Sequence, residues 1–232
     1  MVAAAHPQPF CALSTPFSLL TLLLSSWFDL WTAAAGNSPV EWVAVLTGLA
    51  CVWLAARNTV WNFPVAIVSC LIYVLVYHRV QLYSDRNLQL VFVLMSVYGW
   101  YQWLRGGPQH AELPISRTRP AEWLWLTAGV AAYTSGFGYY LQHYTDAAFP
   151  YVDSFTTGLS LAAQYQLVRK RLENWLVWLL ADAIYVPMLW LKGLAPTSGL
   201  YFVYLILAAY GYWEWRRTMR SQTVSPLSTL AR

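Results

Sequence analysis

Residues 98–105 read Tyr-Gly-Trp-Tyr-Gln-Trp-Leu-Arg, and residues 210–217, which lie 112 positions later, read Tyr-Gly-Tyr-Trp-Glu-Trp-Arg-Arg. The same offset, without a gap, also aligns earlier residues: Arg57 with Arg169, Asn62 with Asn174, Val65 with Val177, Ile72 with Ile184, Tyr73 with Tyr185 and Leu88 with Leu200. A constant offset that matches Asn, Tyr, Gly and Trp is typical of an internal repeat. The sequence therefore predicts two copies of one unit.

The composition is that of a membrane protein. The 232 residues are 58% hydrophobic and only 10% charged, with a mean hydropathy of +0.42. About a quarter of a soluble domain is charged, so a soluble all-helical protein with a large core is disfavoured. The 14 Trp and 16 Tyr exceed what a core requires. Some are expected at the membrane interfaces, and others could line a site for a flat ligand.

Apolar runs predict an all-α membrane protein with about eight transmembrane helices, since each run, with its aromatic flanks, approaches the roughly 20 residues that a spanning helix needs. No Lys or Arg precedes the first run, as a cleavable signal peptide would require. We therefore expect an extra N-terminal helix there, after a disordered segment at 1–16. The runs cover residues 17–35, 42–56, 63–77, 88–104, 123–141, 152–167, 175–191 and 198–215.

The order of the runs predicts how the repeats are oriented. Three helices reverse the chain direction and the single linking helix restores it, so both triplets cross the membrane in the same sense. This is a parallel repeat, with an axis along the membrane normal. The predicted parts are an N-terminal tail and extra helix (1–37), a first three-helix repeat (38–105), a linker and linking helix (106–145), a second three-helix repeat (146–217) and a cytoplasmic tail (218–232).

The basic residues are distributed unevenly across these eight spans. One side receives Arg79, Arg86 and Lys192, and the other side receives the remaining 11 of the 14 Lys and Arg. The positive-inside rule places the richer side in the cytoplasm. We therefore expect a cytoplasmic C-terminus and, with eight spans, a cytoplasmic N-terminus. The richer side carries Arg57, Arg105, Arg117, Arg119, Arg169, Lys170, Arg171, Arg216, Arg217, Arg220 and Arg232.

Polar and aromatic side chains share one face on each of three predicted helices, because their spacing of three or four residues follows the helical period. A face toward lipid would carry Leu, Ile, Val and Phe without amide or carboxyl groups. We therefore predict a substrate-binding site that contains Gln89, Phe92, Trp100, Trp103, Asn174, Trp178, Asp182, Tyr185, Tyr204 and Tyr212.

Each of these residue types has a structural alternative. The Trp and Tyr near residues 98–103 and 210–215 could form an interfacial aromatic belt. Asn62 and Asn174 both precede an apolar run and could cap a helix. Asp182 lies about eight residues into an apolar run, where a carboxylate costs on the order of 3 kcal/mol and marks a candidate functional site. The structural alternative for Asp182 is a protonated carboxyl group that hydrogen-bonds to a neighbouring helix.

The counterpart of Asp182 in the first repeat is Cys70, so the two halves differ at this position.

Signatures of other functions are missing from the sequence. It has no HExxH, GxSxG or Walker motif, and its three Cys have no CxxC spacing that would suggest a metal site. We expect no cofactor and no metal. The net charge of +4 needs no nucleic acid to explain it.

A family resemblance rests on paired motifs. They are Asn58-x-x-Trp61-Asn62-Phe63-Pro64, Leu82-Tyr83-Ser84-Asp85 before residues 88–92, the segment 98–103, Asp153, Glu173-Asn174-Trp175-x-x-Trp178 and the segment 210–215. Over roughly residues 38–217 the chain resembles the PnuC nicotinamide riboside transporters of bacteria. That family is built like the SWEET sugar carriers, with two three-helix bundles around a linking helix.

The resemblance implies facilitated diffusion of a vitamin precursor through the inner membrane with alternating access. Nicotinamide riboside is the expected substrate, thiamine and riboflavin are alternatives, and a cytosolic kinase would trap the imported molecule by phosphorylation. Aromatic faces could hold the cationic ring, each worth about 0.5–2 kcal/mol. Asn174 and Gln89 suit the ribose and carboxamide, and Asp182 could balance the ring charge. We also expect a homo-oligomer, as is common for small membrane carriers.

Two other classes of function are disfavoured by the sequence. An intramembrane enzyme that uses Asp182 would need a second acidic group or a His near mid-membrane, and the sequence offers none. A structural or receptor subunit would not need polar and aromatic faces inside both bundles. The carrier is the favoured hypothesis.

Overall fold

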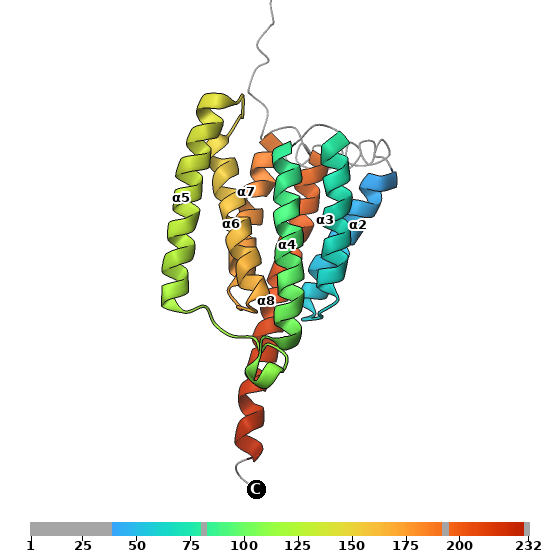
Figure 1. Ribbon diagram of the computed structural model, residues 1–232, viewed down its shortest axis with the longest axis vertical. Helices are drawn as coiled ribbons and strands as arrows, with labels where there is room; N and C mark the ends of the chain where they lie inside the picture. The colour runs from blue at the N-terminus through green and yellow to red at the C-terminus, as the bar shows by residue number, and fades with distance from the viewer. Residues whose placement is uncertain (1–38, 80–82, 192–194, 230–232) are drawn as a thin grey trace, which may run out of the picture. The chain divides into compact units, whose positions relative to one another are not determined.

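The computed structural model describes residues 39–79, 83–191 and 195–229 (Figure 1). All secondary-structure elements of the described residues are helices, which confirms the predicted all-α class. The helix expected at 17–35 and the segment 1–16 lie outside the described residues. Seven α-helices and one short 3-10 helix, Pro108–His110, follow in order. The α-helices are α2 (Pro39–Ala56), α3 (Asn62–Arg79), α4 (Tyr83–Arg105), α5 (Pro120–Tyr144), α6 (Pro150–Val168), α7 (Asn174–Leu191) and α8 (Ala195–Thr229).

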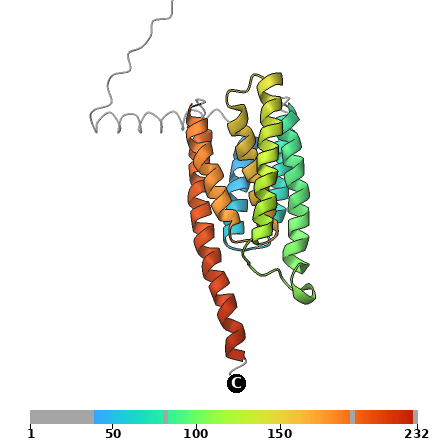
Figure 2. The ribbon, with the colours of Figure 1, turned by 90° about the vertical axis from the view of Figure 1, so that its left-hand side faces the viewer.

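Six of these helices close into a ring. Each of α2, α3, α4, α6, α7 and α8 packs against the next in that order, and α8 returns to pack against α2. Helix α5 lies outside the ring and packs on α6. Helices α2, α4, α6 and α8 run in one direction, and α3, α5 and α7 run in the other (Figures 1 and 2). The ring therefore has a central axis that all six helices surround.

Local hydrogen bonds recur at the offset of 112 residues. The Nδ2 group of Asn62 donates to the carbonyl of Thr59 (2.7 Å), and the Nδ2 group of Asn174 donates to the carbonyl of Arg171 (2.6 Å). Both contacts tie the first residue of a helix to the loop before it. The two loops also share a left-handed residue at one position, Asn58 (φ 53°) in the first and Lys170 (φ 49°) in the second.

Two tryptophans cross between the halves in the same matched way. The indole Nε1 of Trp103 on α4 donates to the carbonyl of Leu167 on α6 (3.1 Å). The indole Nε1 of Trp215 on α8 donates to the carbonyl of Ala55 on α2 (2.9 Å). Donor and acceptor positions both differ by 112 residues, so each half supplies a donor to the other and accepts one in return.

An aromatic cluster fills the ring at this same end. The ring of Phe63 meets Trp103 edge-on (centroids 4.9 Å apart), and the ring of Trp175 meets Trp215 edge-on (5.6 Å). Trp103 and Trp215 lie 5.7 Å apart and join the two pairs. All four side chains are buried, and the ammonium of Lys170 lies 4.4 Å above the Trp103 ring. The interior at this end is therefore filled by large side chains.

The linker between α4 and α5 is bound to the loop between α6 and α7. Ser116 makes two backbone hydrogen bonds, from its N–H to the carbonyl of Lys170 (3.0 Å) and from the N–H of Leu172 to its own carbonyl (2.9 Å). The carboxylate of Glu173 accepts from both the N–H and the hydroxyl of Thr118 (2.8 and 3.0 Å). These contacts fix the linker against the second half of the chain.

An ion pair continues the same attachment to the start of α5. The guanidinium of Arg171 lies 2.5 Å from the carboxylate of Glu122 and also donates to the hydroxyl of Ser116 (2.6 Å). Burial raises the pKa of Glu122, but the hydrogen bonds from Arg171 and the Arg119 backbone, with the charges of Arg171 and Arg169, outweigh it and hold this pKa below its usual value.

Hydropathy and length together single out α7 among the described helices: its 18 residues have a mean hydropathy of 1.4, enough to cross a bilayer. The apolar parts of α2 and α3, Val45–Ala56 and Asn62–Leu75, are shorter. Helix α8 continues through Thr229, well beyond the apolar run that ends at 215, and extends away from the other helices (Figure 1). Arg, Met and Gln in this extension are good helix formers.

Candidate functional site

Helix α7 places a carboxyl group in the interior of the ring. Asp182 lies at the middle of Asn174–Leu191, and only 3% of its surface is exposed. A buried acidic residue at mid-helix is costly in a membrane and faces a bundle interior or an aqueous cavity. The structure thus gives the sequence-predicted Asp182 the interior position that the prediction requires.

The hydroxyl of Tyr204 on α8 lies close to this carboxyl group. Its electrostatic neighbours are Tyr73 on α3, Cys51 on α2 and Asp182 on α7, so four helices contribute to one cluster. A Cβ atom on Gly48 of α2 would lie 2.8 Å from the Tyr204 hydroxyl oxygen. Glycine at that position lets the tyrosine approach the α2 backbone.

A second group of hydroxyls surrounds Tyr185, three residues along α7 from Asp182. The Tyr185 hydroxyl lies near the hydroxyls of Thr156, Thr157 and Ser160 on α6, each of which donates to a carbonyl of its own helix. Its ring lies 4.6 Å from that of Tyr201 on α8. The hydroxyl side chains in the first half of α6 therefore face a tyrosine of the neighbouring helix.

Asn174 is fully buried at the start of α7. Its amide group donates to the carbonyl of Arg171, which is the capping role weighed for it, while its Oδ1 atom has no hydrogen-bond partner. The indole Nε1 of the next residue, Trp175, is also buried without a partner. Buried polar atoms are nearly always paired. At this end of α7, the Asn174 oxygen lacks a hydrogen-bond donor and the Trp175 N–H lacks an acceptor.

The predicted aromatic residues lie at different depths. Trp103 is a buried member of the aromatic cluster, and Trp178 and Tyr212 are half-buried against the hydrophobic core that contains it. Trp100 is 38% exposed. Gln89 and Phe92 are half-buried on α4, about three turns or more from Trp103. The structure therefore brings Asp182, Tyr185 and Tyr204 together and places Trp103 at the filled end of the ring.

Two members of the Tyr204 cluster were not predicted from the sequence. Tyr73 could have been found, because it is the repeat counterpart of Tyr185. Cys51 gives no such signal, since a single small residue in an apolar run is usually a packing residue. Its position next to Tyr204 depends on the contact between α2 and α8, which are far apart in the sequence.

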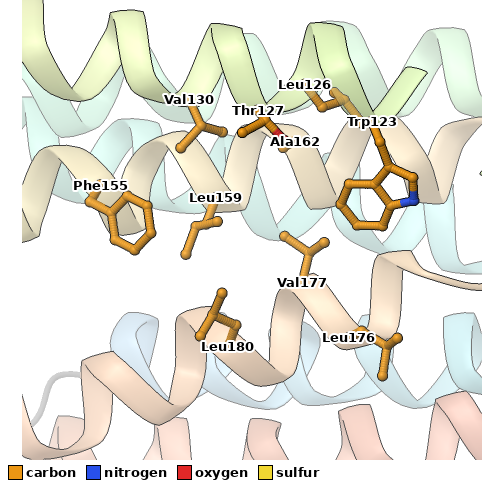
Figure 3. A pocket seen from close by; sticks show the side chains of 10 residues that line it. All are labelled: Trp123, Leu126, Thr127, Val130, Phe155, Leu159, Ala162, Leu176, Val177 and Leu180. Atoms are coloured by element: carbon orange, nitrogen blue, oxygen red, sulfur yellow. The ribbon is translucent and has the colours of Figure 1, made fainter. Parts of the chain in front are cut away.

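The site combines one carboxyl group, phenol and aliphatic hydroxyls, and aromatic rings. These groups suit the binding of a flat, polar or cationic molecule through stacking, cation–π contacts and hydrogen bonds. Within the described ranges, no three His, Cys, Asp or Glu lie close enough to hold a metal ion. The apolar groove between α5 and α7 (Figure 3) contains none of the polar side chains of this cluster.

The chain is similar to known proteins in sequence and in fold. The model of the nicotinamide mononucleotide transporter family matches residues 38–217. The nicotinamide riboside transporter PnuC of Escherichia coli (strain K12) is 27% identical over 222 residues, covering 84% of this chain and 93% of that protein. The riboflavin/roseoflavin transporter RibM of Streptomyces davaonensis is 28% identical over 190 residues, covering 80% and 84%.

A solved structure has the same fold. The crystal structure of the vitamin B3 transporter PnuC superposes with a TM-score of 0.64 at 23% sequence identity, and the match covers 89% of this chain and 93% of the other. The likeness extends over both halves of the described chain, so it includes the ring of helices as well as the repeated segments.

Proposed function

Because the chain belongs to the nicotinamide mononucleotide transporter family, we propose that it carries nicotinamide riboside across the membrane by facilitated diffusion. Membership of this family makes it a multi-pass protein of the bacterial inner membrane. The observation that carries the substrate proposal is the long match to relatives named as nicotinamide riboside transporters. The geometry around Asp182 supports it.

The chemistry of the cluster fits this substrate. Nicotinamide riboside has a flat, positively charged ring and several ribose hydroxyls. The Asp182 carboxylate balances one positive charge, and the rings of Tyr185 and Tyr204 offer faces for stacking. The free Oδ1 of Asn174 can accept from a hydroxyl or an amide. Trp178, Tyr212, Trp100, Gln89 and Phe92 complete the proposed site, with Trp103 at its filled end.

The proposed architecture is two parallel three-helix units, α2–α4 and α6–α8, related by an axis through the ring, with α5 as the linking helix. It is supported by the hydrogen bonds that recur at the 112-residue offset. With the additional N-terminal helix the chain would have about eight spans. Alternating access then requires that the aromatic cluster around Trp103 and Trp215 separate to open the cytoplasmic side.

Uptake into proteoliposomes tests the function directly. Purified wild-type protein should take up radiolabelled nicotinamide riboside without ATP or an ion gradient, and unlabelled substrate should compete. Asp182→Asn keeps the side-chain shape but removes the charge, and we expect it to lose most uptake while inserting normally. Ser221→Ala, on the exposed extension of α8, is the matched control. Equal uptake by Asp182→Asn and wild type would exclude the charge-balancing role.

Riboflavin is the second candidate substrate, because RibM is similar to this chain over four fifths of its length. Riboflavin is flat but uncharged, so its binding would not require the Asp182 carboxylate. Uptake of radiolabelled riboflavin that persists in Asp182→Asn would favour riboflavin, whereas uptake of radiolabelled thiamine, which is cationic, would be lost in that variant. Trapping by a cytosolic kinase and assembly into a homo-oligomer remain predictions that accompany the proposal.

A further inference from the structure

An apolar groove opens on the side of the ring between α5 and α7, with α6 as its floor (Figure 3). Its volume is about 360 Å³, and Thr127 is the one polar residue in a lining of leucine, valine, alanine and aromatic side chains. Helix α6 packs against both α5 and α7. The groove therefore follows α6 on the outer surface from Phe155 to Ala162.

The walls of this groove are accessible from outside. Trp123 on α5 is 37% exposed, and Leu176 and Leu180 on α7 are 43% and 49% exposed. A contiguous exposed patch of this kind marks a surface that contacts a partner or lipid. Because α5 lies outside the six-helix ring, the groove opens away from the substrate site.

One end of the groove is basic. Trp123 lies one helical turn after Arg119, whose carbonyl accepts the Trp123 N–H (3.1 Å). Arg171 is paired with Glu122, whereas Arg169 is not ion-paired with it and acts on it only through longer-range electrostatics. The Glu173 carboxylate accepts from Thr118 at the same end. Arg119, Arg169 and Arg171 thus face two carboxylates there, and one positive charge remains beside a tryptophan of the kind that lies at membrane interfaces.

We propose that this groove binds one anionic phospholipid. An acyl chain lies along the lining from Trp123 toward Phe155, and the phosphate lies beside Arg119 and Arg169. Basic pockets between transmembrane helices on the cytoplasmic side recognise anionic head groups. A zwitterionic lipid fills the apolar part equally well but gains less from the two arginines.

Charge also favours a lipid over a second copy of the chain. Copies in one membrane share their orientation, so a second copy would bring its own arginine-rich end beside Arg119 and Arg169. Like charges across an interface oppose association. An anionic head group instead neutralises the arginines.

Native mass spectrometry of the full chain in detergent tests the head-group preference. Phosphatidylglycerol and phosphatidylcholine with identical acyl chains are added in turn, and we expect retained phosphatidylglycerol to exceed phosphatidylcholine. Arg119→Ala combined with Arg169→Ala should reduce that preference by about fivefold per arginine, the factor that corresponds to about 1 kcal/mol for each basic residue near a membrane surface. Arg220→Ala, on the α8 extension, should leave it unchanged. Equal retention of both lipids by the wild type would overturn the proposal.

A second pair of variants tests the groove itself. Thr127→Trp fills the groove and should displace the retained phosphatidylglycerol. Ala128→Trp adds the same side chain to the next, exposed position of α5, outside the lining, and should retain the lipid. Size-exclusion chromatography checks that both variants are folded. If Thr127→Trp is not folded, the head-group preference of the arginine variants is the test of the proposal. If Thr127→Trp separates an oligomer and leaves lipid retention intact, the groove is a contact between copies and the proposal fails.

Discussion

Asn62 and Asn174 occupy equivalent positions, and each amide donates to the carbonyl three residues earlier. They differ in what remains after that bond. The Oδ1 of Asn174 is buried without a partner, and so is the indole Nε1 of Trp175, where the first half has the apolar Phe63. The two halves thus share a structural contact, while the second half alone offers this additional pair of unpaired polar atoms.

This difference predicts different effects of the same substitution. Asn62→Ala and Asn174→Ala each lose one loop hydrogen bond, so each should lower the stability of the folded protein by about 1 kcal/mol. Only Asn174→Ala also removes the free Oδ1 acceptor, so only this variant should raise the KM for nicotinamide riboside. Thermal unfolding and proteoliposome uptake of the two purified variants provide the comparison. Equal KM values for both would assign Asn174 to capping alone.

Lys170 predicts a dependence of stability on pH. Burial lowers the pKa of Lys170 to about 8, although the charge of Glu112 acts in the opposite direction. Between pH 8 and the ordinary value of 10.5, the unfolded chain retains a proton that the folded chain has lost, so stability rises with pH in this window. The gain is on the order of 1–3 kcal/mol, because one pKa unit corresponds to about 1.4 kcal/mol.

Lys170→Asn removes the titrating group and places there the residue type that stands at the left-handed position of the first loop, Asn58. The wild type should gain stability relative to this variant as the pH rises from 8 to 10, and melting curves of both proteins across this range measure the gain. Parallel melting curves over the range would show that Lys170 keeps its proton throughout.

At the level of helices, close packing depends on two glycines at equivalent positions. A Cβ atom on Gly99 of α4 would collide with the ring of Phe63 on α3, and one on Gly211 of α8 would lie 2.7 Å from the ring of Trp175 on α7. The aromatic side chains cannot withdraw, because both are buried. In each half, the third helix therefore approaches the second only where glycine stands.

Alanine at either glycine should destabilise the protein. Overpacking of this kind costs about 1–3 kcal/mol, so Gly99→Ala and Gly211→Ala should both lower the melting temperature. Gly129→Ala on α5 is the matched control, since a Cβ atom there meets nothing within 4 Å; it should be neutral or stabilise by up to about 1 kcal/mol. A melting temperature for Gly211→Ala at or above that of Gly129→Ala would contradict the packing argument.

For the described residues, the sequence predicted the existence and order of the α-helices, because apolar runs are local signals. It did not predict that α8 continues through Thr229, because the residues after 215 are polar. It did not predict the depth of each residue. The face from Gln89 to Trp103 spans about 21 Å along the helix axis. The same face therefore includes a half-buried glutamine and a tryptophan that belongs to the buried aromatic cluster. The contact between Ser116 and Lys170 was also missed, because it joins distant segments through backbone groups.

At the scale of the whole chain, the helix directions place the end of α8 and the linker 106–119 at one end of the helices and the segment 145–149 at the other (Figure 1). The first end carries most of the Lys and Arg, so it should be cytoplasmic. A fluorescent protein fused after Thr229 should therefore fluoresce, and alkaline phosphatase fused after Asp146 should be active in cells. The reverse pattern of the two reporters would invert the proposed orientation.

The crossed bonds of Trp103 and Trp215 bear on how the two halves depend on each other. A lone three-helix half would leave one indole N–H and one backbone oxygen without partners, and two such halves facing each other would satisfy both. Each half therefore depends on the other for one donor and one acceptor, so neither half is complete as a separate folding unit. The two halves differ at positions outside this exchange, such as aspartate at 182 and cysteine at 70.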